Sequence, residues 1–176
     1  MNNDIKEFLS IIQSIKRADY FNASRTYQHH GGKSTVYRHS IRCAYRAYRI
    51  GKYFKIGKDK LKSTVIAALL HDSYGYDRVA NHVGIVSSIK YNNGLEKLTH
   101  LHAFYHGKEA VDFTSQYVEL NKNQKDAIIK HMFPLYPLPP LHIEGWILTL
   151  ADKLVATEEC IDTAKLFVVN GISPRK

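Results

Sequence analysis

Apolar residues recur at steps of three and four along most of this chain, and few segments alternate between apolar and polar positions. This spacing places apolar side chains on one face of an α-helix, so it favours a largely helical fold. Glycine-rich, polar and proline-rich segments separate the helical ones. We therefore expect a single all-α domain over residues 1–176, a helical bundle with helices at about 5–15, 36–54, 61–72, 103–119, 123–131 and 144–167, and a weaker one at 81–91.

Length and composition agree with one globular domain. The chain has 176 residues, of which 44% are hydrophobic and 23% charged. It has no apolar run near the roughly 18–20 residues that span a bilayer, and its start, MNNDIKEFLS, lacks the order of a signal peptide. We expect a cytoplasmic protein with no membrane partner. Cys43 and Cys160 are too few for a disulfide framework or a thiolate zinc site, and we expect both to pack as small apolar residues.

Six ionisable side chains fall on the apolar faces of these helices. His39 shares its stripe with Cys43, Ala47 and Phe54, and Asp152 lies inside the apolar run GWILTLADKLVA. The full set is His39, His71, Asp72, His106, His131 and Asp152. Because burying an unpaired charge is costly, inward-facing histidines and aspartates from several helices are most simply explained by shared metal ions. Such ligands suit divalent iron, manganese, zinc or nickel, and magnesium is a further candidate.

The order of these residues resembles a known family. His39, then His71 and Asp72, then Asp152 is similar to the H…HD…D signature of the HD-domain metal-dependent phosphohydrolase superfamily. The segments VYRHSIRCAYRAYRIGKYF, TVIAALLHD and ILTLADKLVATEE resemble the family's three ligand helices. The resemblance covers about residues 28–160, and HDSYGYD and HMFPL are similar to a group of small bacterial HD proteins.

The resemblance implies an all-α core that hydrolyses a phosphomonoester or phosphodiester with metal-activated water. By matching positions, one metal would be held by His39, His71, Asp72 and Asp152. Asp72 would bridge to a second metal at His106 and His131, so we expect one or two divalent ions per chain. His71 and Asp72 would be the catalytic pair.

Two departures from known branches of the family narrow the choice of substrate. Gly75 and Tyr76 stand where some alarmone hydrolases carry acidic residues, and the Gly-Tyr-Pro signature of the cyclic-di-GMP branch is absent. These departures favour a different small phosphorylated metabolite as the substrate, with a nucleotide as the leading candidate.

The net charge of +9 is concentrated at the start of the chain. Residues 1–60 carry 13 Lys and Arg against 4 acids, whereas residues 61–176 carry 12 of each. Part of this excess is a stripe on the helix of His39, formed by Arg38, Arg42, Arg46 and Arg49. Arginine forks suit phosphate oxygens, so we expect Arg38 and Arg42 to bind a small anionic substrate. The alternative is a solvated face that only aids solubility.

Other histidines are candidates for substrate contact. His30, with His29 beside it, lies in the loop before the first ligand helix and either reaches the substrate or lies exposed. His102 precedes His106 by one helical turn on the same face, so it is a substrate contact or competes with His106 as the ligand.

Three other functions fit the same residues. The basic charge also suits a phosphodiesterase or nuclease with nucleic acid as partner, which would bind with strong salt dependence. A protein can also keep such a metal centre for binding without turnover. A two-iron oxygenase on a similar scaffold would instead consume oxygen.

Overall fold

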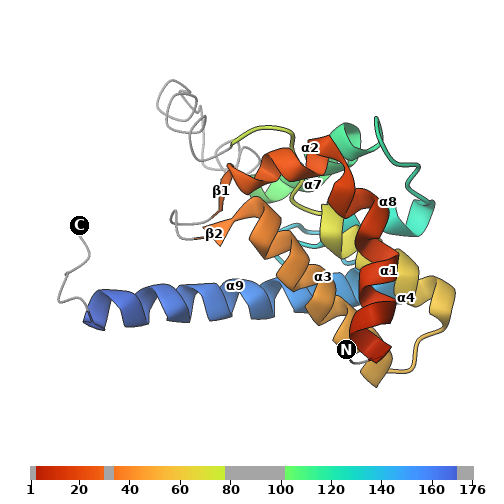
Figure 1. The fold of residues 1–176 in the computed structure, drawn as a ribbon. Helices are drawn as coiled ribbons and strands as arrows, with labels where there is room; N and C mark the ends of the chain where they lie inside the picture. Colours follow the sequence, from red (N-terminus) through yellow and green to blue (C-terminus); the bar gives the residue numbers. More distant parts are fainter. Residues whose placement is uncertain (1–2, 30–33, 78–101, 170–176) are drawn as a thin grey trace.

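A computed structural model describes residues 3–29, 34–77 and 102–169 of the chain, and these residues are mainly helical (Figure 1). The expected all-α architecture is confirmed. The helices are α1 (Asn3–Arg17), α2 (Asp19–Asn22), the 3-10 turn η1 (Ala23–Arg25), α3 (Val36–Tyr53), α4 (Lys58–Leu70), α7 (His102–Thr114), α8 (Lys122–Lys130) and α9 (Ile143–Val169). The weak helix expected at 81–91 lies outside the described residues.

Helix α4 is the centre of the core. It packs against α1, α3, α8 and α9. Its buried residues are Leu61, Ser63, Thr64, Val65, Ala67, Ala68, Leu69 and Leu70, which lie on more than one face of the helix. A helix surrounded by others is buried in this way because no face is left for solvent.

Helix α4 ends before the residues that carry the expected chemistry. The expected helix was 61–72, but α4 spans Lys58–Leu70, and His71 is its C-cap. A turn follows in which Gly75 has a φ of +80°, and a Cβ there would lie 2.3 Å from the Phe113 ring. Only glycine fits this turn, which places His71 and Asp72 where neighbouring helices meet.

Helix α9 runs along one side of the bundle. Its first half packs against α3, α4 and α8, and its C-terminal half extends beyond them (Figure 1). This helix therefore carries Asp152 into the core and leaves Cys160 exposed, so the expectation that Cys160 packs as an apolar residue was wrong.

A short hairpin precedes α3 where the sequence predicted only a loop. Strand β1 (Gln28–His29) pairs antiparallel with β2 (Ser34–Thr35). The Tyr27 hydroxyl donates a hydrogen bond to the Gly75 carbonyl at 3.1 Å, and the Gln28 amide donates to Asp77 Oδ2 at 3.1 Å. These bonds hold the hairpin against the turn after α4. Strands of two residues are too short for any alternation to reveal them.

No helix in the described parts of the chain combines the length and the apolar character needed to cross a membrane.

Candidate metal centre

The six inward-facing residues predicted from the sequence come together between five helices. Each is at most 9% exposed. Their positions are His39 on α3, His71 and Asp72 after α4, His106 on α7, His131 after α8, and Asp152 on α9. Their roles as ligands stay a prediction, but the structure places them as neighbours.

One group of atoms surrounds a point between α3, the end of α4 and α9. Asp152 Oδ1 lies 3.2 Å from His39 Nε2 and 3.6 Å from His71 Nε2. Asp72 Oδ2 lies 3.5 Å from His71 Nε2 and 3.8 Å from His39 Nε2. Ligand atoms about 2.1 Å from a cation are about 3.0–3.4 Å apart in octahedral or tetrahedral geometry. The four side chains therefore fit one divalent cation with only small adjustments.

The His71 ring is oriented for ligation. Its Nδ1 donates to the Ala68 carbonyl at 2.9 Å, so in the neutral ring Nε2 carries a lone pair. That Nε2 is buried and has no hydrogen-bond partner in the described part of the chain. A carbonyl that fixes the tautomer of a ligand histidine is a common arrangement at metal sites. A cation held here would satisfy this orphaned atom and both carboxylates at once.

A second group lies on the other side of Asp72. Its Oδ1 is 3.9 Å from His106 Nε2 and 4.0 Å from His131 Nε2, and these two nitrogens are 2.9 Å apart. His131 Nδ1 donates to the Ile128 carbonyl at 2.6 Å, which again leaves a lone pair on Nε2 of the neutral ring. The Tyr74 hydroxyl donates a hydrogen bond to Asp72 Oδ1. The two oxygens of Asp72 thus face different histidine groups, as a bridging carboxylate would.

The electrostatic field differs between the two groups. Burial lowers the pKa of His71, but the nearby carboxylates of Asp72 and Asp152 outweigh it and raise the pKa to about 9. Burial raises the pKa of Asp72, but the neighbouring His71, His29 and His39 hold it well below its usual range. Burial and the neighbouring His106 lower the pKa of His131 to about 3. The group that contains Asp72 and Asp152 therefore attracts positive charge, and His131 stays in the neutral form that binds metals.

Two further residues join the first group. His29 Nε2 lies 3.1 Å from Asp72 Oδ2, and its ring stacks on His39 with centroids 3.8 Å apart. Glu159 Oε2 lies 3.1 Å from His39 Nδ1 and 3.4 Å from His29 Nδ1. Glu159 follows Asp152 by seven residues, which is about two helical turns on the same face. That spacing was a signal for Glu159 that the sequence analysis did not use.

Cys43 contributes a sulfur atom to the same region. Its Sγ lies 3.2 Å from His39 Nε2, and the side chain is fully buried. The atoms that His39, Cys43, His71 and Asp152 offer all lie within 4.8 Å of one another. Burial raises the pKa of the Cys43 thiol well above its usual value, as do the nearby carboxylates. This neutral thiol packs in the core, as expected.

The predicted substrate contacts have different surroundings. Arg38 is exposed at the start of α3. Arg42 pairs with Glu159 Oε1 at 3.1 Å and with Glu158 Oε2 at 3.0 Å. His30 lies outside the described residues, whereas its neighbour His29 is buried at the site. Only the backbone of His102 is described, as the first residue of α7. His106, one helical turn later, lies beside Asp72.

Comparison with known proteins identifies the family. The HD domain family model matches residues 36–157, which is more than half of the chain and contains all six inward-facing residues. Searches of curated proteins and of solved structures found no match. The chain belongs to the HD-domain family, the metal-dependent phosphohydrolase superfamily to which the order of His39, His71–Asp72 and Asp152 pointed.

Proposed function

We propose that this protein hydrolyses the phosphomonoester or phosphodiester bond of a small phosphorylated metabolite at a centre of one or two divalent metal ions. A nucleotide is the leading candidate for the substrate. The observation that carries the proposal is the position of Asp72. One of its oxygens faces His39 and His71, and the other faces His106 and His131. A single buried carboxylate between two histidine groups suits two cations a short distance apart.

The ligands divide between two positions. The first position has His39, His71, Asp72 and Asp152, and the second has Asp72, His106 and His131. Bound there, divalent cations supply Lewis acidity, which lowers the pKa of water and neutralises negative charge on phosphate oxygens. Imidazole and carboxylate donors favour manganese, iron, zinc or nickel over an all-oxygen calcium site.

The chain's own residues hold this arrangement in place. The carbonyls of Ala68 and Ile128 fix the tautomers of His71 and His131. Glu159 accepts a hydrogen bond from His39 Nδ1, which orients that ring and makes its Nε2 a stronger donor. His71 and Asp72 have the central catalytic role because His71 Nε2 lies near the carboxylates of both Asp72 and Asp152, and the two oxygens of Asp72 face the two histidine groups.

Substrate phosphate would be bound by Arg38 and Arg42, with His30 and His102 as further candidates. Arg38 has an exposed guanidinium at the start of the helix that carries His39. Arg42 already contacts two carboxylates, so it reaches a phosphate only when that phosphate replaces one of them.

The test combines metal analysis with an activity panel. The protein is purified without chelators, its metal content is measured, and phosphomonoesters and phosphodiesters are tested with added manganese, iron or nickel. His71→Ala and Asp72→Ala are expected to abolish phosphate release and to lower the metal content. His142→Ala, which removes an exposed imidazole, is the matched control and keeps both. Circular dichroism checks that each variant is folded.

Five results would overturn the proposal. A protein without bound metal after chelator-free purification, or phosphate release that survives His71→Ala, contradicts it directly. Cleavage limited to oligonucleotides, with steep loss of activity as salt rises, would establish the nuclease alternative. Oxygen uptake by an iron-loaded protein would establish the oxygenase alternative. Metal binding without any turnover would establish the non-catalytic alternative.

A further inference from the structure

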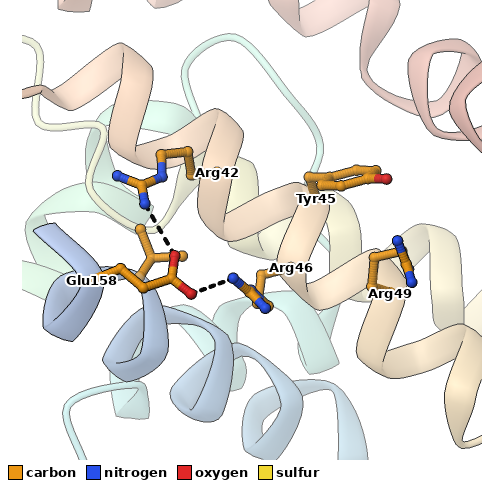
Figure 2. Close-up of a pocket in the computed structure, with 6 residues that line it drawn as sticks. Arg42, Tyr45, Arg46, Arg49 and Glu158 are labelled. Carbon is orange, nitrogen blue, oxygen red and sulfur yellow. Dashed lines mark hydrogen bonds and ion pairs between the residues drawn. The ribbon is translucent and has the colours of Figure 1, made fainter.

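A small pocket lies between α3 and α9, beside the metal centre and separate from it. It has a volume of about 280 Å³ and is lined by Arg42, Tyr45, Arg46, Arg49, Val155 and Glu158 (Figure 2). We propose that this pocket binds a phosphate group, and that Glu158 occupies the place of that group when no ligand is present. The proposal concerns binding alone, so it does not depend on hydrolysis.

The charges of the pocket favour an anion. Three of its lining residues are arginines and one is an acid. Arg49 has no carboxylate within ion-pair distance in the described part of the chain, and the neighbouring Tyr45 raises the pKa of its guanidinium. The planar guanidinium groups present paired donors, which match the oxygens of phosphate. A volume just below the range of about 300–1,000 Å³ typical of larger organic ligands suits a small ionic group.

Glu158 shows how such a ligand would be held. Its Oε2 accepts from Arg42 at 3.0 Å, and its Oε1 accepts from Arg46, so one carboxylate lies between two guanidinium groups (Figure 2). The side chain of Glu158 is 40% exposed and that of Arg46 is 42% exposed. Ion pairs this exposed contribute little to stability. A phosphate with more charge and more acceptor oxygens can therefore displace the carboxylate into solvent.

The floor of the pocket is fixed by packing. Tyr45 lies edge-on against Phe8, with ring centroids 5.1 Å apart. Val155 is buried between Asp152 and Glu158 on α9. Arginines on a rigid helix surface lose less conformational freedom when they bind than arginines on a loop.

Helix geometry separates this pocket from the metal centre. Arg46 follows His39 by seven residues, which is about 10 Å along the axis of α3. Glu158 follows Asp152 by six residues, which is about 9 Å along α9. Arg42 is the connection, because it contacts Glu158 in the pocket and also Glu159, the partner of His39. For this reason Arg42 is not used in the test.

The experiment measures the binding of inorganic phosphate to the full-length protein by calorimetry. The double variant Arg46→Ala/Arg49→Ala is expected to bind phosphate about tenfold more weakly or worse, because two charge-assisted donors are removed. Glu158→Gln is expected to bind about threefold to tenfold more tightly, because the competing charge is gone. This gain cannot come from misfolding.

Matched controls remove the same charges elsewhere. Lys60→Ala/Lys62→Ala removes two cations from exposed positions of α4, and Glu119→Gln neutralises an exposed acid. Each measurement is repeated with His71→Ala added, so that binding at the metal centre is distinguished from binding in the pocket. The proposal is overturned if the double arginine variant binds phosphate as the lysine control does, or if Glu158→Gln leaves the affinity unchanged. Neither result bears on whether the metal centre hydrolyses phosphate esters.

The source of the phosphate is decided by kinetics. If the pocket holds a second phosphate of the substrate itself, Arg46→Ala/Arg49→Ala raises KM and leaves kcat unchanged. If it holds a separate anion, KM stays unchanged while the affinity for inorganic phosphate still falls. Both results support a phosphate site and assign its ligand.

Discussion

His39 shows how one residue is placed for the proposed metal site. Its Nε2 faces Asp152, its Nδ1 faces Glu159, and the ring of His29 covers it. Both nitrogens of an imidazole cannot bind the same cation, so one serves the metal and the other holds the ring in position. In the proposed centre, Glu159 is thus a positioning residue for His39.

The Glu159→Gln variant tests this role. An amide is a weaker acceptor for the His39 N–H, so the affinity for the first metal is expected to fall by about 10-fold to 100-fold. The affinity is measured by competition with a coloured chelator, and the fold is checked by circular dichroism. Glu158→Gln, one residue away, contacts arginines and no histidine, so it is the matched control and keeps the metal affinity. Equal affinities in both variants would show that Glu159 has no part in metal binding.

Helix α7 is positioned by close contact with α8. A Cβ on Gly107 would lie 2.5 Å from the Ile128 carbonyl oxygen and 2.8 Å from the Ile129 Cα. Both are backbone atoms, so no side chain can move to make room. The absence of a side chain at Gly107 therefore brings His106 close to His131.

Gly107→Ala is expected to push the two helices apart. The cost is about 1–3 kcal/mol, which in a chain of this size lowers the melting temperature by several degrees. Because His106 is adjacent, we also expect fewer metal ions per chain by elemental analysis. The control is Gly57→Ala, where the added Cβ meets no atom within 4 Å. A Gly107→Ala protein as stable and as rich in metal as Gly57→Ala would disprove the close approach.

Periodicity predicted the faces of the helices better than their ends. Cys43 and Ala47 share the buried face of α3 with His39, as the steps of four predict. Phe54 continues the same stripe but is 61% exposed, because α3 ends at Tyr53 and the face ends with it. Tyr117 lies inside the helix expected at 103–119 but is 54% exposed, because α7 ends at Thr114. Helix ends depend on turns and contacts that a repeat of apolar residues does not contain.

At the scale of the whole molecule, the metal centre joins most of the fold. Its residues come from α3, α7 and α9 and from the ends of α4 and α8. Any ligand that binds the folded chain and not the unfolded chain stabilises the fold by mass action. The thermal stability of the molecule should therefore respond to metal.

Removal of the metal by a chelator is expected to lower the melting temperature of the wild-type protein. At a free metal concentration of about 100 times the Kd, the stabilisation lost is about 2.7 kcal/mol. Differential scanning calorimetry with and without the chelator measures it. The Asp72→Ala variant is the control, since it has lost its shared ligand and should melt at the same temperature in both conditions. An equal shift in both proteins would mean that the chelator acts elsewhere.

The metal-free protein is also expected to have a stability maximum near neutral pH. The pKa values of His29 and His71 are raised from 6.5 to about 9. Their favourable contribution to the free energy of unfolding is therefore complete below pH 6.5 and is lost as the pH rises through 9. The pKa of His131 is lowered from 6.5 to about 3, so its neutral buried form costs stability as the pH falls below 6.5.

Melting temperatures between pH 5 and pH 9.5 test this prediction, with the metal present and absent. Cations replace the lost protons at high pH, so the increase in melting temperature caused by the metal should grow as the pH rises. An increase that becomes smaller between pH 6.5 and pH 9 would contradict the prediction.

The sequence by itself determined the helical class, the inward faces and the six residues that meet at the centre, because helical periodicity is local and burial of charge is costly. It also predicted that Asp72 stands between two sets of histidines, through the resemblance to the HD family. Only the tertiary structure decided that His29 is buried at the centre, that Glu159 supports His39, and that Glu158 occupies an arginine pocket. These contacts join residues more than 100 positions apart or depend on a two-residue strand, and no local pattern encodes such distances.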